Sequence, residues 1–283
     1  MKQFKNRTIR LSIALTLFLT AFTAHAEEFT TKDLNEEAIL ASSWVQNSAE
    51  FKSLAYQAFN IAKLRWDADE PNKGAEPEKR AVVVDVDETI IDNSAFSAGL
   101  VGKDYGYGDS RWKEWASDMS ATAIPGAVEF LKHVVNTGGD VFYVTNRKAM
   151  PKKNVDLTEV TMKNLKALGF PQIDEKHMLF RSGTAKKQPR RDSITAMGYR
   201  TVLLLGDNLA DFDEVFDGDT MPVRDAAVVQ NKDKFGDKFI VLPNPIYGNW
   251  EAALYGGGKW YKKTAKERSD IRINTLKRFN FSE

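Results

Sequence analysis

Residues 81–89 read Ala-Val-Val-Val-Asp-Val-Asp-Glu-Thr, and the fold prediction starts from this segment. Four successive apolar residues followed at once by acidic ones are typical of a short strand that is buried on both faces of a parallel sheet. Four more runs of this kind lie at residues 141–144, 178–180, 202–205 and 239–242. We therefore expect five buried strands, with Asp85 and Asp87 where the first strand ends.

Helical patterns lie between these runs. An amphipathic segment covers residues 126–135. Asp156 and Glu159 can cap a second helix, which Gly169 ends, and a third pattern covers residues 191–197. Strands that alternate with helices predict an α/β fold, a doubly wound parallel sheet flanked by helices. Ligands of such sheets bind beyond the carboxyl ends of the strands, so the residues that follow each strand are site candidates.

Residues 1–26 are predicted to be a cleavable export signal. The segment starts with four basic residues, Lys2, Lys5, Arg7 and Arg10. An apolar run at 11–22 follows, and then a small-x-small cleavage site, Ala24-His25-Ala26. The run is shorter than the about 20 apolar residues of a transmembrane helix. We expect a periplasmic or secreted bacterial protein without a membrane anchor.

The composition excludes several classes of site and partner. The chain has no cysteine, which excludes disulfides, thiolate zinc sites and a cysteine nucleophile. It has 40 basic and 39 acidic residues, and the charged residues of the predicted signal are all basic. The chain without its signal is therefore slightly acidic, which offers no general attraction to nucleic acid or to an anionic membrane.

Composition and periodicity divide the chain into further segments. Residues 27–66 are expected to be helical, because Ser48 can cap a helix whose apolar residues recur with a 3.6-residue period. The charged stretch 67–80, which contains proline and glycine, is typical of a linker. The remaining segments are a core at 81–258, a cap inserted at about 92–124 and a basic C-terminal helix or tail at 259–283.

The residues at the strand ends favour phosphoryl transfer. They are Asp85 and Asp87, Thr145 and Asn146, Lys186 and Lys187, and Asp207 and Asp211. A carboxylate can attack phosphorus to form an aspartyl phosphate, while a second group protonates the departing oxygen and then activates water. The charge on the phosphoryl oxygens needs a metal ion, a cation and neutral donors. Asp85 and Asp207 can supply carboxylates to Mg²⁺, which prefers oxygen ligands.

Two segments resemble the signatures of the class C acid phosphatases, a family within the haloacid dehalogenase (HAD) superfamily. Residues 83–89 look like the first signature and residues 205–212 like the second, and the similarity extends through 141–147 and 242–250. It covers roughly residues 30–260. The resemblance implies a HAD-like core with a small helical cap. One departure is Phe96, where the signature usually carries Tyr.

The resemblance also implies roles for the four aspartates. Asp85 would be the nucleophile and a metal ligand. Asp87 would be the acid/base and would give Mg²⁺ its backbone carbonyl. Asp207 would complete the metal site, and Asp211 would lie beside it as a ligand through water or as an orienting group.

Phosphoryl binding is assigned in the same way. Thr145 and Lys187 would hold the phosphoryl oxygens, and Asn146 is a further candidate for substrate contact. The distance of Lys187 from the segment 197–199 favours it over Lys186, but the sequence leaves both open.

Members of the class favour nucleoside 5′-monophosphates and hold the base between aromatic rings. Trp112, in the cap insertion, and Tyr247, after the last strand, are the matching candidates. Stacking on such rings contributes about 1–3 kcal/mol per base. The alternative is that both rings are packing residues of the cap. The family further implies a homodimer.

Three other interpretations remain open at this point. The protein could be a general acid phosphatase without nucleotide preference, or a non-catalytic binding protein on the same fold. A dehalogenase-type hydrolase is disfavoured by Asp87, because a halide leaving group needs no proton. For the phosphatase we expect an acidic pH optimum, because Asp87 must be protonated near the carboxylates of Asp85 and Asp207.

Overall fold

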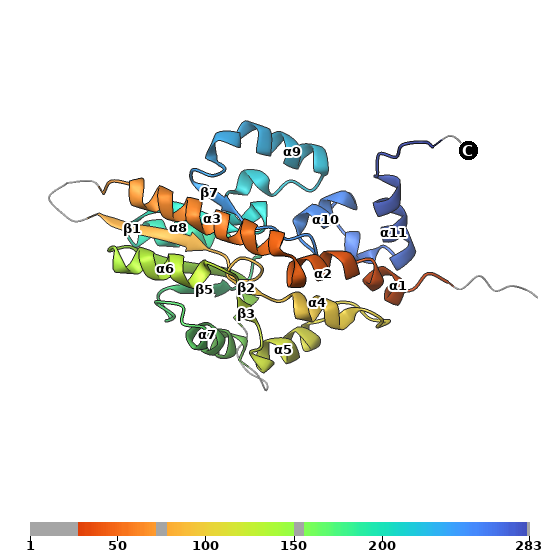
Figure 1. Cartoon of the computed structure of the whole chain (residues 1–283), viewed down its shortest axis with the longest axis horizontal. Helices are drawn as coiled ribbons and strands as arrows, with labels where there is room; N and C mark the ends of the chain where they lie inside the picture. The colour runs from red at the N-terminus through yellow and green to blue at the C-terminus, as the bar shows by residue number, and fades with distance from the viewer. Residues whose placement is uncertain (1–27, 72–77, 150–155, 282–283) are drawn as a thin grey trace, which may run out of the picture.

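The computed structural model describes residues 28–71, 78–149 and 156–281, and at its centre lies a five-stranded parallel sheet (Figure 1). The strands are β1 (Lys79–Val84), β4 (Asp140–Lys148), β5 (Met178–Arg181), β6 (Tyr199–Gly206) and β7 (Phe239–Val241). Their order is β5-β4-β1-β6-β7, so the chain adds strands on one side of β1 and then on the other. The reversal lies between β1 and β6, which end directly before Asp85 and Asp207. Ligands of doubly wound sheets bind at this point.

Each face of the sheet carries its own hydrophobic core. In β1 the side chains alternate, with Val82 and Val84 in one core and Ala81 and Val83 in the other. The first core is covered by α3 (Ala49–Ala68), α6 (Ala127–Asn136) and α7 (Leu157–Ala167), and the second by α8 (Gln188–Ala196) and α9 (Met221–Gln230). The predicted α/β fold is confirmed, and each predicted apolar run lies in or at the end of a strand.

The N-terminal segment consists of helices and is part of the main core. Helices α1 (Thr31–Glu36) and α2 (Ile39–Asn47) precede α3, whose N-cap Ser48 accepts a hydrogen bond from the Phe51 N–H at 3.0 Å. The helix reaches Ala68, two residues into the expected linker, because Trp66 is buried and its indole N–H donates to Thr137 at 2.8 Å. Residues 72–77 of that linker lie outside the described residues.

The ends of the next helices differ slightly from expectation. The Asp156 side chain accepts from the Thr158 N–H at 2.9 Å and caps α7, whereas Glu159 pairs with Lys163 on the surface at 2.7 Å. Gly169 follows this helix with a φ of +86°, the left-handed conformation that favours glycine. Helix α8 begins at Gln188, three residues before the expected start, which places Lys187 at its N-cap.

The expected cap insertion forms a small unit beside the sheet. It consists of β2 (Ile91–Asp92), α4 (Ser94–Leu100), α5 (Asp109–Asp118) and β3 (Thr122–Ala123). Strands β2 and β3 pair antiparallel, which returns the chain to the core. Helix α5 packs against α7, and α4 packs against α2.

The C-terminal region returns to the N-terminal helices (Figure 1). Helix α10 (Asn249–Leu254) is followed by α11 (Ala265–Asn274), which contacts α1. Arg272 of α11 pairs with Glu37 at 2.8 Å and with Glu251 at 2.6 Å, so the expected solvated helix is anchored on one side. The short 3-10 helices are η1 (Leu209–Asp211), η2 (Glu214–Phe216), η3 (Lys232–Lys234) and η4 (Trp260–Lys262).

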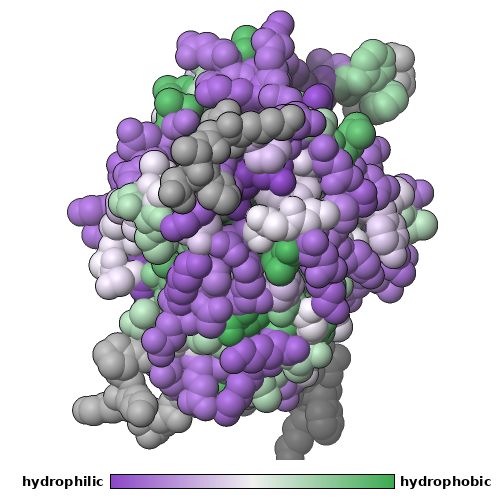
Figure 2. Space-filling model, turned by 90° about the vertical axis from the view of Figure 1, so that its left-hand side faces the viewer, coloured by the Kyte–Doolittle hydropathy of each residue, from purple (hydrophilic) through white to green (hydrophobic). Residues whose placement is uncertain are grey.

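The surface at the amino-terminal ends of the strands is mostly hydrophilic, with isolated hydrophobic residues (Figure 2). Across the described ranges, no helix has the length and apolar character needed to cross a membrane. The predicted signal at 1–26 lies outside the described residues.

Candidate active site

The loop after β1 places Asp85 at the carboxyl end of the sheet. The Asp85 N–H donates to the Leu205 carbonyl at 3.0 Å, which fixes the loop against β6. The chain then turns back, because the Ile90 N–H donates to the Val86 carbonyl at 3.0 Å. Glu88 adopts a left-handed conformation within this turn, with a φ of +56°. The turn leaves Asp85 at the carboxyl ends of β1 and β6, next to Asp207.

Three carboxylates converge there. One oxygen each of Asp85, Asp207 and Asp211 lie within 4.8 Å of one another. The Thr89 hydroxyl is 3.5 Å from Asp85 Oδ2 and 3.3 Å from Asp207 Oδ1, and the Asn244 amide donates to Asp207 Oδ2 at 2.8 Å. Neutral donors therefore fix the carboxylate of Asp207 from two sides.

Asp211 reaches this cluster because residue 206 is a glycine. A Cβ on Gly206 would lie 2.7 Å from Asp211 Cγ and closer still to its Cβ and Oδ2. The Asp211 side chain instead folds over Gly206 and accepts a hydrogen bond from the Asn208 N–H at 3.0 Å. This bond closes the capping box of η1 and holds the carboxylate toward Asp85.

Lys187 is the lysine that the structure brings to the cluster. Its buried ammonium contacts Asp85 Oδ1 and lies 2.6 Å from Asp211 Oδ1. Lys186 points away, with its side chain 64% exposed and 3.8 Å from Asp217. Burial opposes the charge on Lys187, but the carboxylates of Asp211 and Asp85 raise its pKa, so it stays a cation.

The carboxylates outnumber the cations that contact them. Burial raises the pKa of Asp85 well above its usual range; Lys187 opposes this, and the neighbouring acids add to it. Burial and Asp211 raise the pKa of Asp207 to about 7. Three carboxylates around one ammonium leave excess negative charge, which is costly when it is buried. A divalent cation would balance this charge. The all-oxygen ligand set of the cluster fits a hard cation.

Asp87 lies outside this group of three and contacts a guanidinium. Arg147 Nη2 donates to Asp87 Oδ1 at 2.8 Å and Asn93 Nδ2 to the same oxygen at 2.9 Å. Only acidic neighbours of Asp87 were expected from the sequence, so Arg147 is a site residue that was not predicted. The available signal was the position of Arg147 directly after Thr145 and Asn146.

Thr145 and Asn146 occupy different environments at the end of β4. Thr145 is fully buried, and its hydroxyl oxygen accepts from the Arg147 N–H at 3.0 Å. Asn146 is exposed, and its Oδ1 accepts from Arg190 Nη2 at 2.7 Å. Arg190 also contacts the Thr145 carbonyl, so it braces this end of β4.

The two aromatic candidates have polar and aromatic neighbours. The Trp112 ring lies edge-to-face with Phe96, with centroids 5.2 Å apart, and Arg147 lies 5.3 Å from its centroid. Trp112 and Asn146 line a shared cavity of about 70 Å³. Tyr247 is 38% exposed, and its hydroxyl donates to the buried carboxylate of Glu88. No ring contact joins Trp112 and Tyr247 in the described part of the chain.

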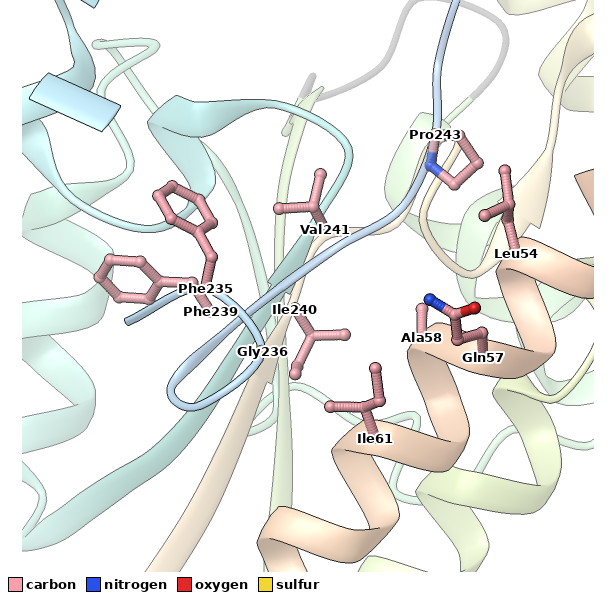
Figure 3. Close-up of a pocket in the computed structure, with 10 residues that line it drawn as sticks. All are labelled: Leu54, Gln57, Ala58, Ile61, Phe235, Gly236, Phe239, Ile240, Val241 and Pro243. Carbon is pink, nitrogen blue, oxygen red and sulfur yellow. The ribbon is translucent and has the colours of Figure 1, made fainter. Parts of the chain in front are cut away.

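A larger cavity of about 300 Å³ lies elsewhere, between α3 and the edge strand β7 (Figure 3). Leu54 and Ile61 of α3 border it opposite Ile240 and Val241. Leu54, which is half-exposed, belongs to this wall. Its lining contains no charged residue and none of the predicted site residues, so it offers no group for phosphoryl chemistry.

Known proteins match the chain at both the sequence and the structure level. The family model for acid phosphatases of HAD superfamily subfamily IIIB matches residues 3–250. A class C acid phosphatase structure from Bacillus anthracis is 39% identical, with a TM-score of 0.78, covering 87% of this chain and 99% of that one. A second class C acid phosphatase structure from Bacillus anthracis, with tungstate bound, is 36% identical with a TM-score of 0.77 over the same coverage.

A more distant curated relative is the stem 31 kDa glycoprotein of Glycine max. It is 24% identical over 131 residues, which make up 43% of this chain and about half (49%) of that protein. Because the family model covers most of the chain, and the Bacillus anthracis enzyme is matched over nearly its whole length, the family assignment rests on these two. The chain belongs to the acid phosphatases of HAD subfamily IIIB, phosphomonoester hydrolases that include the class C enzymes.

Proposed function

We propose that the protein is a Mg²⁺-dependent phosphomonoesterase that acts through an aspartyl phosphate on Asp85. The observation that carries the proposal is the contact of Asp85 with the ammonium of Lys187 beside Asp207 and Asp211, at the carboxyl ends of β1 and β6. The tungstate bound to the Bacillus anthracis enzyme supports an oxyanion site in the family, because tungstate is tetrahedral like phosphate.

The reaction has two steps. An Asp85 carboxylate oxygen attacks phosphorus, the bond to the ester oxygen breaks, and Asp87 gives its proton to that oxygen. Asp87 then takes a proton from water, the water oxygen attacks phosphorus, and the bond to Asp85 breaks to release phosphate. Lys187 and the Thr145 hydroxyl hold the phosphoryl oxygens, and Lys187 keeps Asp85 oriented. Bound Mg²⁺ would be held by Asp85, Asp207, the Asp87 carbonyl and Asp211, and would supply positive charge to the phosphoryl oxygens.

We further propose an acidic pH optimum, export from the cytoplasm and a homodimer. As substrates we propose nucleoside 5′-monophosphates, with Trp112 and Tyr247 as base contacts. The half-exposed ring of Tyr247, fixed through its hydroxyl on Glu88, supports the base contact. The edge-to-face packing of Trp112 on Phe96 favours the second candidate, a general acid phosphatase in which Trp112 only packs the cap.

Phosphate release tests the proposal. A nucleoside 5′-monophosphate and an aryl phosphate are compared between pH 5 and 7, with Mg²⁺ and then with EDTA. Metal-dependent release from both, with the lower KM for the nucleotide, is expected. Release from the aryl phosphate alone would leave the phosphatase chemistry and remove the nucleotide assignment. No release from either with any divalent metal would overturn the catalytic proposal.

A further inference from the structure

The carboxylate of Asp87 is held unevenly. Its Oδ1 accepts from Arg147 Nη2 at 2.8 Å, from Arg147 Nε at 3.0 Å and from Asn93 Nδ2 at 2.9 Å. Its Oδ2 accepts only the longer bond from Arg147 Nε at 3.2 Å among the described residues. A carboxylate oxygen has two lone pairs, so Oδ1 is saturated and Oδ2 has capacity left.

The donors that hold Oδ1 are themselves fixed. Asn93 is almost fully buried, and its Oδ1 accepts from the Trp115 indole at 2.9 Å and from Arg147 at 3.3 Å. These contacts orient the amide so that its NH₂ group faces Asp87. The backbone N–H of Asn93 donates to Glu88 at 2.9 Å, which ties the start of the cap to the loop that carries Asp87.

Arg147 is fixed along the whole guanidinium. Only 4% of the residue is exposed, its Nη1 donates to Thr161 of α7 at 2.9 Å, and the guanidinium carbon lies 5.3 Å from the Trp112 ring centroid. A buried guanidinium that donates to a carboxylate through two of its nitrogens defines the orientation of that carboxylate, which an ammonium cannot do.

We propose that Arg147, together with Asn93, is a positioning residue for the acid/base Asp87. The pair occupies Oδ1 and leaves Oδ2 as the oxygen that gives the proton to the leaving group. This inference rests on the proposed function, in which Asp87 is the acid. The Arg147–Asn93 pair joins the core and the cap, because Arg147 comes from β4 and Asn93 from the start of the insertion.

The inference predicts a dependence on the leaving group. A nucleoside alkoxide needs a proton to depart, whereas a nitrophenolate departs readily as an anion, so only the first depends strongly on Asp87. Loss of general orientation or of fold would slow both substrates alike. The first chemical step must be isolated, because Asp87 also activates water in the second step for every substrate.

The test is a single-turnover measurement with excess enzyme and Mg²⁺, following release of the leaving group from a nucleoside 5′-monophosphate and from p-nitrophenyl phosphate. Arg147→Ala is expected to slow release of the nucleoside about 10- to 100-fold and of nitrophenolate by less than about threefold. Arg147→Lys should not restore the nucleoside rate. Asn93→Ala, which keeps the arginine, should shift the ratio in the same direction by a smaller factor, so the test stands if Arg147→Ala fails to fold.

Two further variants separate the possible failures. Arg200→Ala removes a guanidinium that pairs with Asp69 and Glu78 at the opposite end of the sheet, and it should leave the ratio of the two rates unchanged. If Asp87→Asn lowers both rates equally, the proposed acid role of Asp87 is wrong. Asp87→Asn could slow release of the nucleoside selectively while the Arg147 and Asn93 variants slow both substrates equally. That result would overturn the positioning inference, and the Arg147–Asn93 pair would then have only a structural role.

Discussion

Replacing Lys187 by Met removes the cation from the acidic cluster while keeping the length and the apolar stem of the side chain. The ammonium contacts Asp85 and lies 2.6 Å from Asp211 Oδ1. Without it, the carboxylates of Asp85, Asp207 and Asp211 lie together with only neutral donors and no contacting cation among the described residues. The change therefore tests charge balance and not packing.

The expected loss of unfolding free energy is large. Removing one partner of a buried ion pair costs about 3–5 kcal/mol, because the remaining charge stays buried. Lys187 contacts the buried carboxylates of both Asp85 and Asp211, and we expect a loss of about 3–4 kcal/mol at pH 7 in EDTA. The loss should shrink at pH 5, where the carboxyl of Asp207, with its pKa of about 7, is protonated. Urea unfolding followed by tryptophan fluorescence measures the loss of unfolding free energy. The turnover of Lys187→Met should also fall, about 100- to 1,000-fold.

Lys186→Met is the matched control, because the neighbouring lysine is exposed and has a 3.8 Å contact with Asp217. Its effect on unfolding should stay within about 0.5 kcal/mol. A Lys187→Met protein as stable as wild type at pH 7 in EDTA would refute the charge-balance reasoning. So would a Lys186→Met protein that loses as much activity.

Three further predictions follow from the same geometry. In EDTA, wild type should lose stability relative to Asp207→Asn, by up to about 4 kcal/mol, as pH rises from 4 to 8, because the folded-state pKa of Asp207, about 7, lies above the ordinary 3.8. Urea titrations measure this difference, and Mg²⁺ should reduce it. Trp112→Ala should raise KM about 5- to 100-fold for a nucleotide and not for an aryl phosphate; equal changes in steady-state kinetics would make Trp112 a packing residue. Gly206→Ala should displace Asp211 and weaken Mg²⁺ binding at least about tenfold by calorimetry; unchanged affinity would contradict the close-approach argument.

Much of the fold was predictable because its strands are buried on both faces. Such strands appear in sequence as uninterrupted apolar runs, and the acidic residues that follow them mark the carboxyl edge of the sheet. The end of α3 was not predictable from composition. Its last turn is polar on one side like a linker, and it stays helical because Trp66 packs in the core and donates to Thr137.

The parts of the site that could not be predicted depend on partners far apart in the sequence. Arg147 looks like a surface residue until Asp87, 60 positions away, is placed against its guanidinium. The Glu88 contact with Tyr247 spans 159 positions. Lys186 and Lys187 follow the same strand, and only the start of α8 at Gln188 decides which one turns inward.

The measurement that tests the central claim most directly is phosphate release by Asp85→Asn beside wild type, with Mg²⁺ and with EDTA. We expect wild type to release phosphate only with the metal. The variant should release none above the enzyme-free control, while its thermal unfolding shows that the fold is kept, because an amide cannot attack phosphorus. Steady-state turnover by Asp85→Asn within about tenfold of wild type would contradict the assignment of Asp85 as the nucleophile.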